Sequence, residues 1–147
     1  MGFLAKLMET HRDSETDYNK FTLLSEDESN DATIADYPVE VGTEGIWTYR
    51  KWASGITECW GYKGEELIAM TTKWGNMYYS PQLTESFPTS LFIDYPPFVN
   101  VQAYDNGNGS YASIKTWGKN VVSYYAYGVS SQTLNVGFTF EAKGRWK

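Results

Sequence analysis

Apolar and polar residues alternate without interruption near the C-terminus, from residue 134 to residue 142. Successive side chains of a β-strand point to opposite faces, so every second residue of this stretch would lie on the same face. The five residues on one face are all apolar: Leu134, Val136, Phe138, Phe140 and Ala142. Those on the other face are polar or small: Asn135, Gly137, Thr139 and Glu141. The alternation predicts a strand with one buried face, and therefore a fold built on a β-sheet.

Further strands are predicted in the second half of the chain. Small apolar residues alternate with polar ones over residues 99–104, and β-like runs follow at 111–117 and 121–127. Residues 105–110 read Asp-Asn-Gly-Asn-Gly-Ser, and residues of these types accept a positive φ. We therefore expect a turn between the strand that ends at residue 104 and the strand that begins at residue 111.

The first half predicts a hairpin and one separate strand. Two aromatic-rich runs, 46–52 and 56–60, are joined by Ala53-Ser54-Gly55, a spacing that suits a tight hairpin. Residues 66–72 offer a third strand. About seven or eight strands at this spacing predict an all-β fold, an antiparallel β-sandwich over residues 37–147.

The leading segment, residues 1–36, differs from the rest in composition. Its apolar residues recur at helical spacing over residues 2–12, which favours a short amphipathic helix; they are Phe3, Leu4, Leu7 and Met8. Residues 13–36 are rich in acidic, hydroxyl and amide side chains, which is typical of a solvated arm, either a loose tail or an ordered docking arm. We expect residues 1–36 to serve attachment or trimerisation, with Leu4, Leu7 and Met8 in the contact.

The distribution of charge argues against nucleic acid as a partner. The net charge is −6, and residues 1–40 hold three Lys and Arg against ten Asp and Glu. Residues 41–147 hold nine against eight, without a basic cluster of the kind that phosphate backbones recruit. The sequence contains no run of eighteen apolar residues, so it predicts no membrane-spanning helix.

The residue inventory gives little support to catalysis, cofactors or metals. Cys59 is the single cysteine, so a cysteine-built zinc site is excluded, and we expect it to be a small core residue. His11 is the single histidine and lies in the leading segment, away from any predicted sheet. Four carboxylates of the sheet region are available for glycoside cleavage, but nothing selects a pair: Glu44, Glu58, Asp94 and Asp105. We expect no enzyme activity, no cofactor and no metal.

Motifs at both ends of the sheet region resemble a domain common in phage and prophage tail and minor structural proteins of Gram-positive bacteria. The first motif is GIWTYRKW at residues 45–52, followed by SGI at 54–56 and ECWG at 58–61. LFID at 91–94 and the closing GRWK at 144–147 are similar to later parts of the same domain. This resemblance covers about residues 37–147.

A second resemblance is to H-type lectins, which are small β-sandwiches. It rests on Phe87-Pro88, on Pro96-Pro97 before a strand, and on the final Gly144-Arg145-Trp146. Together the resemblances imply a trimeric virion protein of the tail-fibre or receptor-binding type that adheres to the host surface or to its wall polysaccharide. The alternative is an architectural protein without a glycan ligand, such as a capsid decoration, a head fibre or a baseplate component. We expect its partners to be two further copies of itself and other virion proteins.

The aromatic residues suggest two functional surfaces, each with a structural explanation beside it. The strand 47–52 would place Trp47, Tyr49 and Lys51 on one face and would turn Arg50 to the other, where it would stack on rings or form a structural ion pair. A glycan site is predicted where polar turn residues meet ring faces, and its candidate residues are Asp105, Asn106, Asn108, Tyr111, Trp117 and Tyr125. An ordinary turn followed by an edge strand explains these six residues equally well. The same turn has one carboxylate and lacks the later Glu of calcium loops, so it predicts no calcium site.

Overall fold

The computed structural model describes residues 24–26, 32–34 and 36–147, and every regular element in them is a β-strand. The chain divides into two compact units, residues 1–37 and 38–147. In the first unit β1 (Leu24–Glu26) pairs antiparallel with β2 (Ala32–Ile34), within the stretch expected to be a solvated arm. The helix expected over residues 2–12, with Leu4, Leu7 and Met8, lies outside the described residues, as does His11. Within the described ranges no helix is long and apolar enough to cross a membrane.

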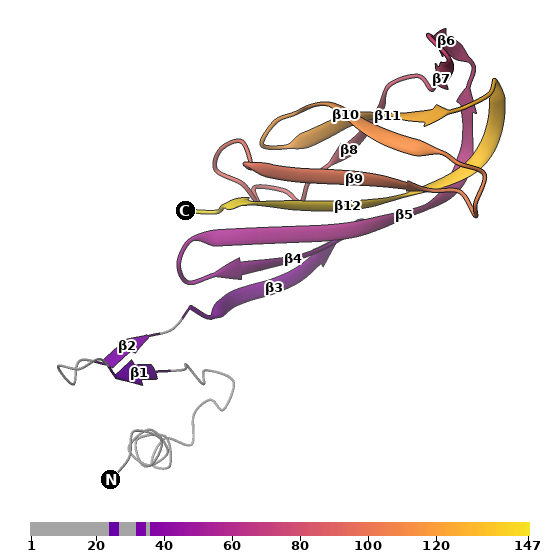
Figure 1. Cartoon of the computed structure of the whole chain (residues 1–147). Coiled ribbons are helices and arrows are strands. Elements are labelled where there is room, and N and C mark those ends of the chain that lie inside the picture. The colour runs from indigo at the N-terminus through magenta and orange to yellow at the C-terminus, as the bar shows by residue number, and fades with distance from the viewer. Residues whose placement is uncertain (1–23, 27–31, 35) are drawn as a thin grey trace. The chain divides into compact units, whose positions relative to one another are not determined.

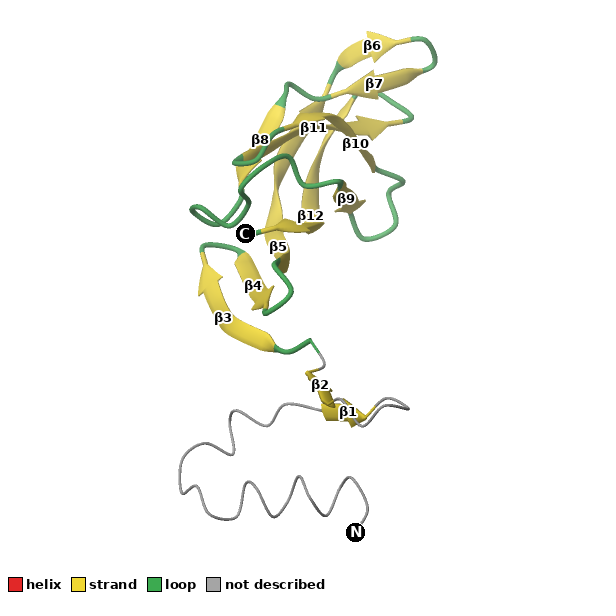
Figure 2. Cartoon of the chain, turned by 90° about the vertical axis from the view of Figure 1, so that its left-hand side faces the viewer, coloured by secondary structure: helices red, strands yellow, loops and turns green. Residues whose placement is uncertain are grey.

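The second unit is an antiparallel β-sandwich, as the alternation predicts (Figure 1). Its larger sheet has the strand order β3 (Pro38–Glu44), β4 (Trp47–Trp52), β5 (Ile56–Met70), β12 (Gln132–Arg145) and β9 (Phe98–Tyr104). Its smaller sheet has the order β10 (Tyr111–Trp117), β11 (Val121–Gly128), β7 (Met77–Tyr79) and β6 (Thr72–Trp74), with β8 (Leu83–Ser86) also paired to β11. Figure 2 shows that loops join these strands throughout the unit. The predicted all-β class and sandwich architecture are confirmed.

The predicted hairpin between β4 and β5 is present. Lys51 lies opposite Thr57 in the antiparallel register, and Gly55 closes the turn by donating its N–H to the Trp52 carbonyl at 3.0 Å. Gly55 has φ of 96°, a value that L-residues with a side chain rarely adopt. Its carbonyl accepts the Trp146 N–H at 2.9 Å, so the turn also holds the C-terminal end of the unit.

The separate strand expected at residues 66–72 is wrong, because β5 continues from Ile56 to Met70 as one strand. Lys63 pairs with Phe138, and Glu66 pairs with Val136. Two residues of β5 therefore lie opposite the single Gly137 of β12, which is a β-bulge. In the sequence, the polar residues around Gly64 indicate the end of a strand. In the structure β5 continues past them, because the bulge accommodates the extra residue.

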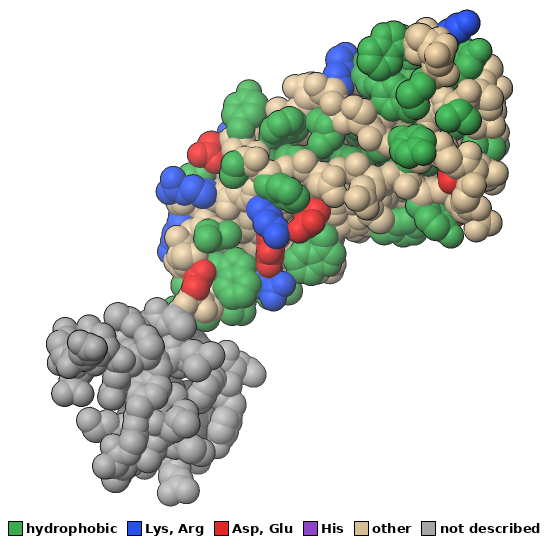
Figure 3. All heavy atoms as spheres, in the orientation of Figure 1, with side chains coloured by type: hydrophobic (Ala, Val, Ile, Leu, Met, Phe, Trp, Pro, Cys, Tyr) green, Lys and Arg blue, Asp and Glu red, His purple; other side chains and the backbone are tan. Residues whose placement is uncertain are grey.

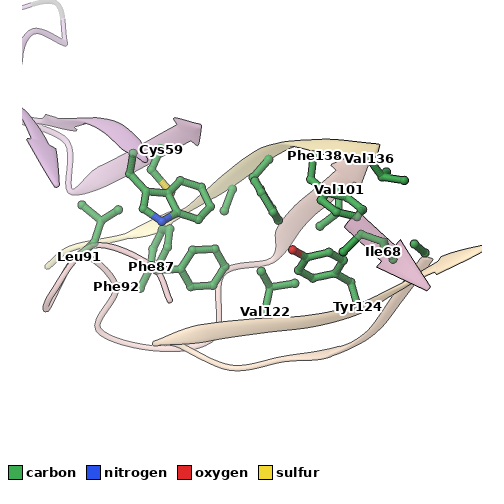
Figure 4. Close-up of a cluster of buried hydrophobic side chains, with 14 of the residues drawn as sticks. Cys59, Ile68, Phe87, Leu91, Phe92, Val101, Val122, Tyr124, Val136 and Phe138 are labelled. Atoms are coloured by element: carbon green, nitrogen blue, oxygen red, sulfur yellow. The ribbon is translucent and has the colours of Figure 1, made fainter. Parts of the chain in front are cut away.

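The core lies between the two sheets and is rich in aromatic rings (Figure 4). From β12 it receives the predicted apolar face, of which Val136, Phe138, Phe140 and Ala142 are buried. Tyr124 of β11 meets Phe138 edge to face, with ring centroids 4.9 Å apart. Cys59 is fully buried, and this burial raises the pKa of its thiol to about 12, so it is a neutral core residue as predicted.

Candidate functional site

The turn predicted at residues 105–110 carries the chain from β9 in the larger sheet to β10 in the smaller one. Asp105 is 7% exposed, and its carboxylate accepts the backbone N–H groups of Gly107 at 3.2 Å, Asn108 at 3.0 Å and Ser110. Asn108 returns a hydrogen bond from its side-chain amide to the Asp105 carbonyl at 2.9 Å. The Asp105 carboxylate is thus engaged in the turn. Asn106 is at φ 56°, the left-handed region that Asn tolerates.

The hydrogen bonds of this turn set the ionisation of Asp105. Burial would raise its pKa, but the bonds from Ser110, Asn108 and Gly107 stabilise the charged form and hold the pKa below the ordinary value. The described residues contain no group of three His, Cys, Asp or Glu side chains that could hold a metal ion. The geometry is that of a structural turn.

Asp105→Asn is expected to lower the free energy of unfolding by about 1–3 kcal/mol at pH 7, since one amide oxygen cannot replace the carboxylate that accepts three N–H groups. The pKa of Asp105 is lower in the folded chain than in the unfolded chain, where it is about 3.9. Its contribution is therefore complete above that pH and is lost as the pH falls through the folded value. Urea unfolding at pH 7 and pH 3 measures both effects, with Asp94→Asn at an exposed position as control. Equal stability of Asp105→Asn and the native chain at pH 7 would contradict this assignment.

The six residues predicted for a glycan site do not form one cluster. Tyr111 and Trp117 lie at opposite ends of β10, opposite Tyr127 and Val122 respectively. Six residues of extended strand separate them by roughly 20 Å. Trp117 donates its indole N–H to the Pro96 carbonyl at 2.9 Å. Tyr111 and Tyr125 instead share the outer face of the smaller sheet, and binding at any of the six residues stays a prediction.

That outer face carries a pocket lined by four aromatic side chains: Trp74, Tyr79, Tyr125 and Tyr127. The pocket is open and has a volume of about 210 Å³. Tyr79 lies directly opposite Tyr127 across the β7–β11 pair, and its ring centroid is 5.5 Å from that of Tyr125. Trp74 meets Tyr127 at 6.2 Å. Figure 3 shows hydrophobic side chains gathered at the end of the unit that carries β6 and β7.

The alternation of β11 explains why these rings face outward. Tyr124 and Ala126 point into the core and are fully buried, so Tyr125 and Tyr127 point to the opposite face. The hairpin of β6 and β7 adds Trp74 and Tyr79, and its turn contains Gly75 at φ 60°. Tyr125 was predicted from the sequence to belong to a binding surface, whereas Trp74 and Tyr79 were not. A signal for them exists: Gly75-Asn76 between runs rich in aromatic residues is a dipeptide typical of tight hairpins.

Polar groups border the pocket. Lys115 lies over the Tyr125 ring, 5.8 Å from its centroid, and donates to the Gln82 side-chain oxygen at 2.6 Å. In the part of the chain that the structure describes, no residue accepts a hydrogen bond from the hydroxyls of Tyr79, Tyr125 and Tyr127. These donors are therefore available to solvent or to a ligand.

On the other predicted surface, β4, Arg50 makes both of the contacts that were expected as alternatives. Arg50 pairs with Glu58 at 3.0 Å and stacks over Trp52 and Trp60, at 5.0 and 5.5 Å from their ring centroids. On the opposite face Tyr49 and Lys51 both donate to Glu40, at 2.9 and 2.8 Å. Arg50 is thus an ion-pair partner on the larger sheet.

The structure defines a small antiparallel β-sandwich with an aromatic pocket on the outer face of one sheet. No protein-family model matches the sequence, and no curated protein matches it. Two solved structures share the fold: an N-truncated R1-type pyocin tail fibre, with 11% identity and a TM-score of 0.54, and a C-terminal portion of the R1 pyocin fibre of P. aeruginosa, with 12% identity and a TM-score of 0.55.

Each match covers 77% of this chain, together with 88% of the first fibre chain and 29% of the second. At such identities the likeness shows the fold alone. The chain thus has a fold found in a tail fibre, while the likeness to H-type lectins and the family inferred from the motifs stay predictions.

Proposed function

We propose that this chain is a non-catalytic bacteriophage structural protein of the tail-fibre type, which acts as a homotrimer in the virion and contacts the host surface. The main support for the proposal is the fold that this chain shares with the N-truncated pyocin tail fibre. The match covers 88% of that fibre chain. A fold accommodates many functions, so a role in host contact needs support from the surface of this chain as well.

The surface supports a role in adhesion. The smaller sheet turns Trp74, 68% exposed, and Tyr111, 59% exposed, to solvent, together with the partly exposed tyrosines of the aromatic pocket. Contiguous exposed apolar patches mark interaction sites or ligand-binding grooves. Three copies in a trimer would present three such surfaces, and simultaneous contacts convert weak sites into tight attachment. Three identical binding surfaces suit a ligand that repeats along a cell wall.

Residues 1–36 are proposed to attach the trimer to other virion proteins, with Leu4, Leu7 and Met8 in the contact. The test compares the full chain with a chain that lacks residues 1–36, first by sedimentation and then by incorporation into particles. The full chain is expected to sediment at about three times its 16.7 kDa mass and to be present in purified particles. The shortened chain is expected to be absent from particles. A monomeric full chain would overturn the trimer, and full incorporation of the shortened chain would overturn the attachment role.

A further inference from the structure

Trp74 is exposed to an extent that core packing does not explain. Its side chain is 68% exposed, and within the described residues its one ring contact is with Tyr127. A tryptophan that stabilises a small domain buries most of its large apolar surface, as Trp47 does at 3% exposure. The exposed indole therefore leaves much of its surface free for a ligand.

The three tyrosine rings of the pocket pack on one another before any ligand arrives. Tyr79 and Tyr127 are cross-strand neighbours, and Tyr125 packs on both, edge to face, at 5.5 and 6.3 Å. All four stand on paired strands of one sheet, so binding would order few side chains and would lose little conformational entropy. Rings fixed at different tilts offer both flat faces and edges to one small ligand.

The size and polarity of the pocket narrow the class of ligand. Its volume of about 210 Å³ lies below the roughly 300 Å³ at which pockets for drug-sized ligands begin, so it suits one ring-sized group. The four lining residues are uncharged, which favours a neutral ligand, and the ammonium of the nearby Lys115 donates to the Gln82 side-chain oxygen at the border of the pocket. Aromatic faces provide apolar contact, while the tyrosine hydroxyls and the Trp74 indole N–H provide hydrogen bonds. A neutral pyranose presents the matching combination, since one face of its ring carries C–H groups and its edge carries hydroxyls.

We propose that the pocket lined by Trp74, Tyr79, Tyr125 and Tyr127 binds one neutral pyranose unit of a surface glycan by ring stacking. This inference rests on the proposed function, and it names the ligand class and places the site away from the turn at residues 105–110. The single unit is bound weakly, and the affinity for a cell comes from several copies that bind together.

The test is a titration of the ¹⁵N-labelled full chain with methyl glycosides of glucose, galactose, mannose and N-acetylglucosamine, followed by NMR. At least one glycoside is expected to shift the Trp74 indole signal saturably, with half-saturation at millimolar concentration; this signal is assigned by its loss in Trp74→Phe. Trp74→Ala is expected to weaken binding about tenfold, which corresponds to about 1.4 kcal/mol. Because Trp74 is exposed, the unfolding midpoint of this variant should stay at the native value.

The matched control is Tyr95→Ala, at a ring that is 70% exposed in the loop before β9 and should not affect binding. Tyr125→Phe keeps the ring but removes its hydroxyl, so it should weaken binding less than Trp74→Ala. No shift at the pocket with any of the four glycosides would overturn the inference. Shifts confined to residues 105–110 would also overturn it, as would equal affinity of Trp74→Ala and the native chain.

Binding to intact bacteria separates this inference from the proposed function. Cell binding that no glycoside inhibits, or that protease treatment of the cells abolishes, would overturn the glycan site and leave host contact standing. Glycoside binding without any attachment to cells would overturn host contact and leave the sugar site standing. Attachment lost in Trp74→Ala and retained in Tyr95→Ala would support both.

Discussion

Phe138→Ala is expected to lower the free energy of unfolding by about 3–5 kcal/mol. Phe138 is fully buried on β12, the strand that pairs with β5 on one side and with β9 on the other. Its ring lies 4.9 Å from that of Tyr124, so it joins the two sheets of the sandwich. Removal of the ring leaves a cavity between two hydrogen-bonded layers that cannot close around it.

Urea unfolding followed by tryptophan fluorescence measures this loss, and Phe98→Ala serves as its control. Phe98 stands on β9 in the same sheet, but it is 44% exposed and contacts Lys143 at 5.7 Å from its ring centroid. Its truncation should cost about 1 kcal/mol or less. Equal losses for the two variants would contradict the placement of the core.

Trp47→Ala is expected to have an effect of similar size, about 3–5 kcal/mol. Trp47 is 3% exposed, and its ring packs between Phe87 and Phe140 at centroid distances of 5.4 and 5.5 Å. Its indole N–H donates to the Ser86 carbonyl at 2.6 Å and so ties β4 of the larger sheet to the end of β8 in the smaller sheet. The variant therefore loses both buried area and a link between the sheets.

Trp47→Phe separates these two contributions. Phenylalanine keeps an aromatic ring between Phe87 and Phe140 but has no N–H for the Ser86 carbonyl, so a smaller loss of about 1–2 kcal/mol is expected. Thermal unfolding by circular dichroism checks the order native, Trp47→Phe, Trp47→Ala. A Trp47→Ala protein as stable as the native chain would show that β4 does not pack on the core as described.

The sequence predicted the strands whose two faces differ. In β12 the alternation reports burial directly, because one face meets the core and the other meets solvent. The hairpin of β4 and β5 was also predictable, since Gly55 marks a tight turn between two aromatic runs. β5 was not predictable as one strand, because a bulge interrupts the alternation at Gly64 and local patterns cannot show which partner strand absorbs the extra residue.

The aromatic pocket was less predictable than the fold. Trp74 and Tyr79 come from a short hairpin, while Tyr125 and Tyr127 come from a strand more than forty residues later, and only the pairing of β7 with β11 brings them together. The turn at residues 105–110 was located correctly, but its carboxylate, that of Asp105, proved to be engaged by backbone N–H groups of the same turn. Composition shows which residues can bind a ligand, whereas the hydrogen-bond network shows which of them are available.

The most direct test of host contact is the attachment of the purified, labelled full chain to intact bacteria of strains that the particle infects and of strains that it does not. We expect saturable attachment to the first set alone, by a protein whose sedimentation mass is about three times that of the chain. A trimer that attaches to neither set, and to no isolated wall polysaccharide, would contradict host contact and would leave an architectural role in the particle.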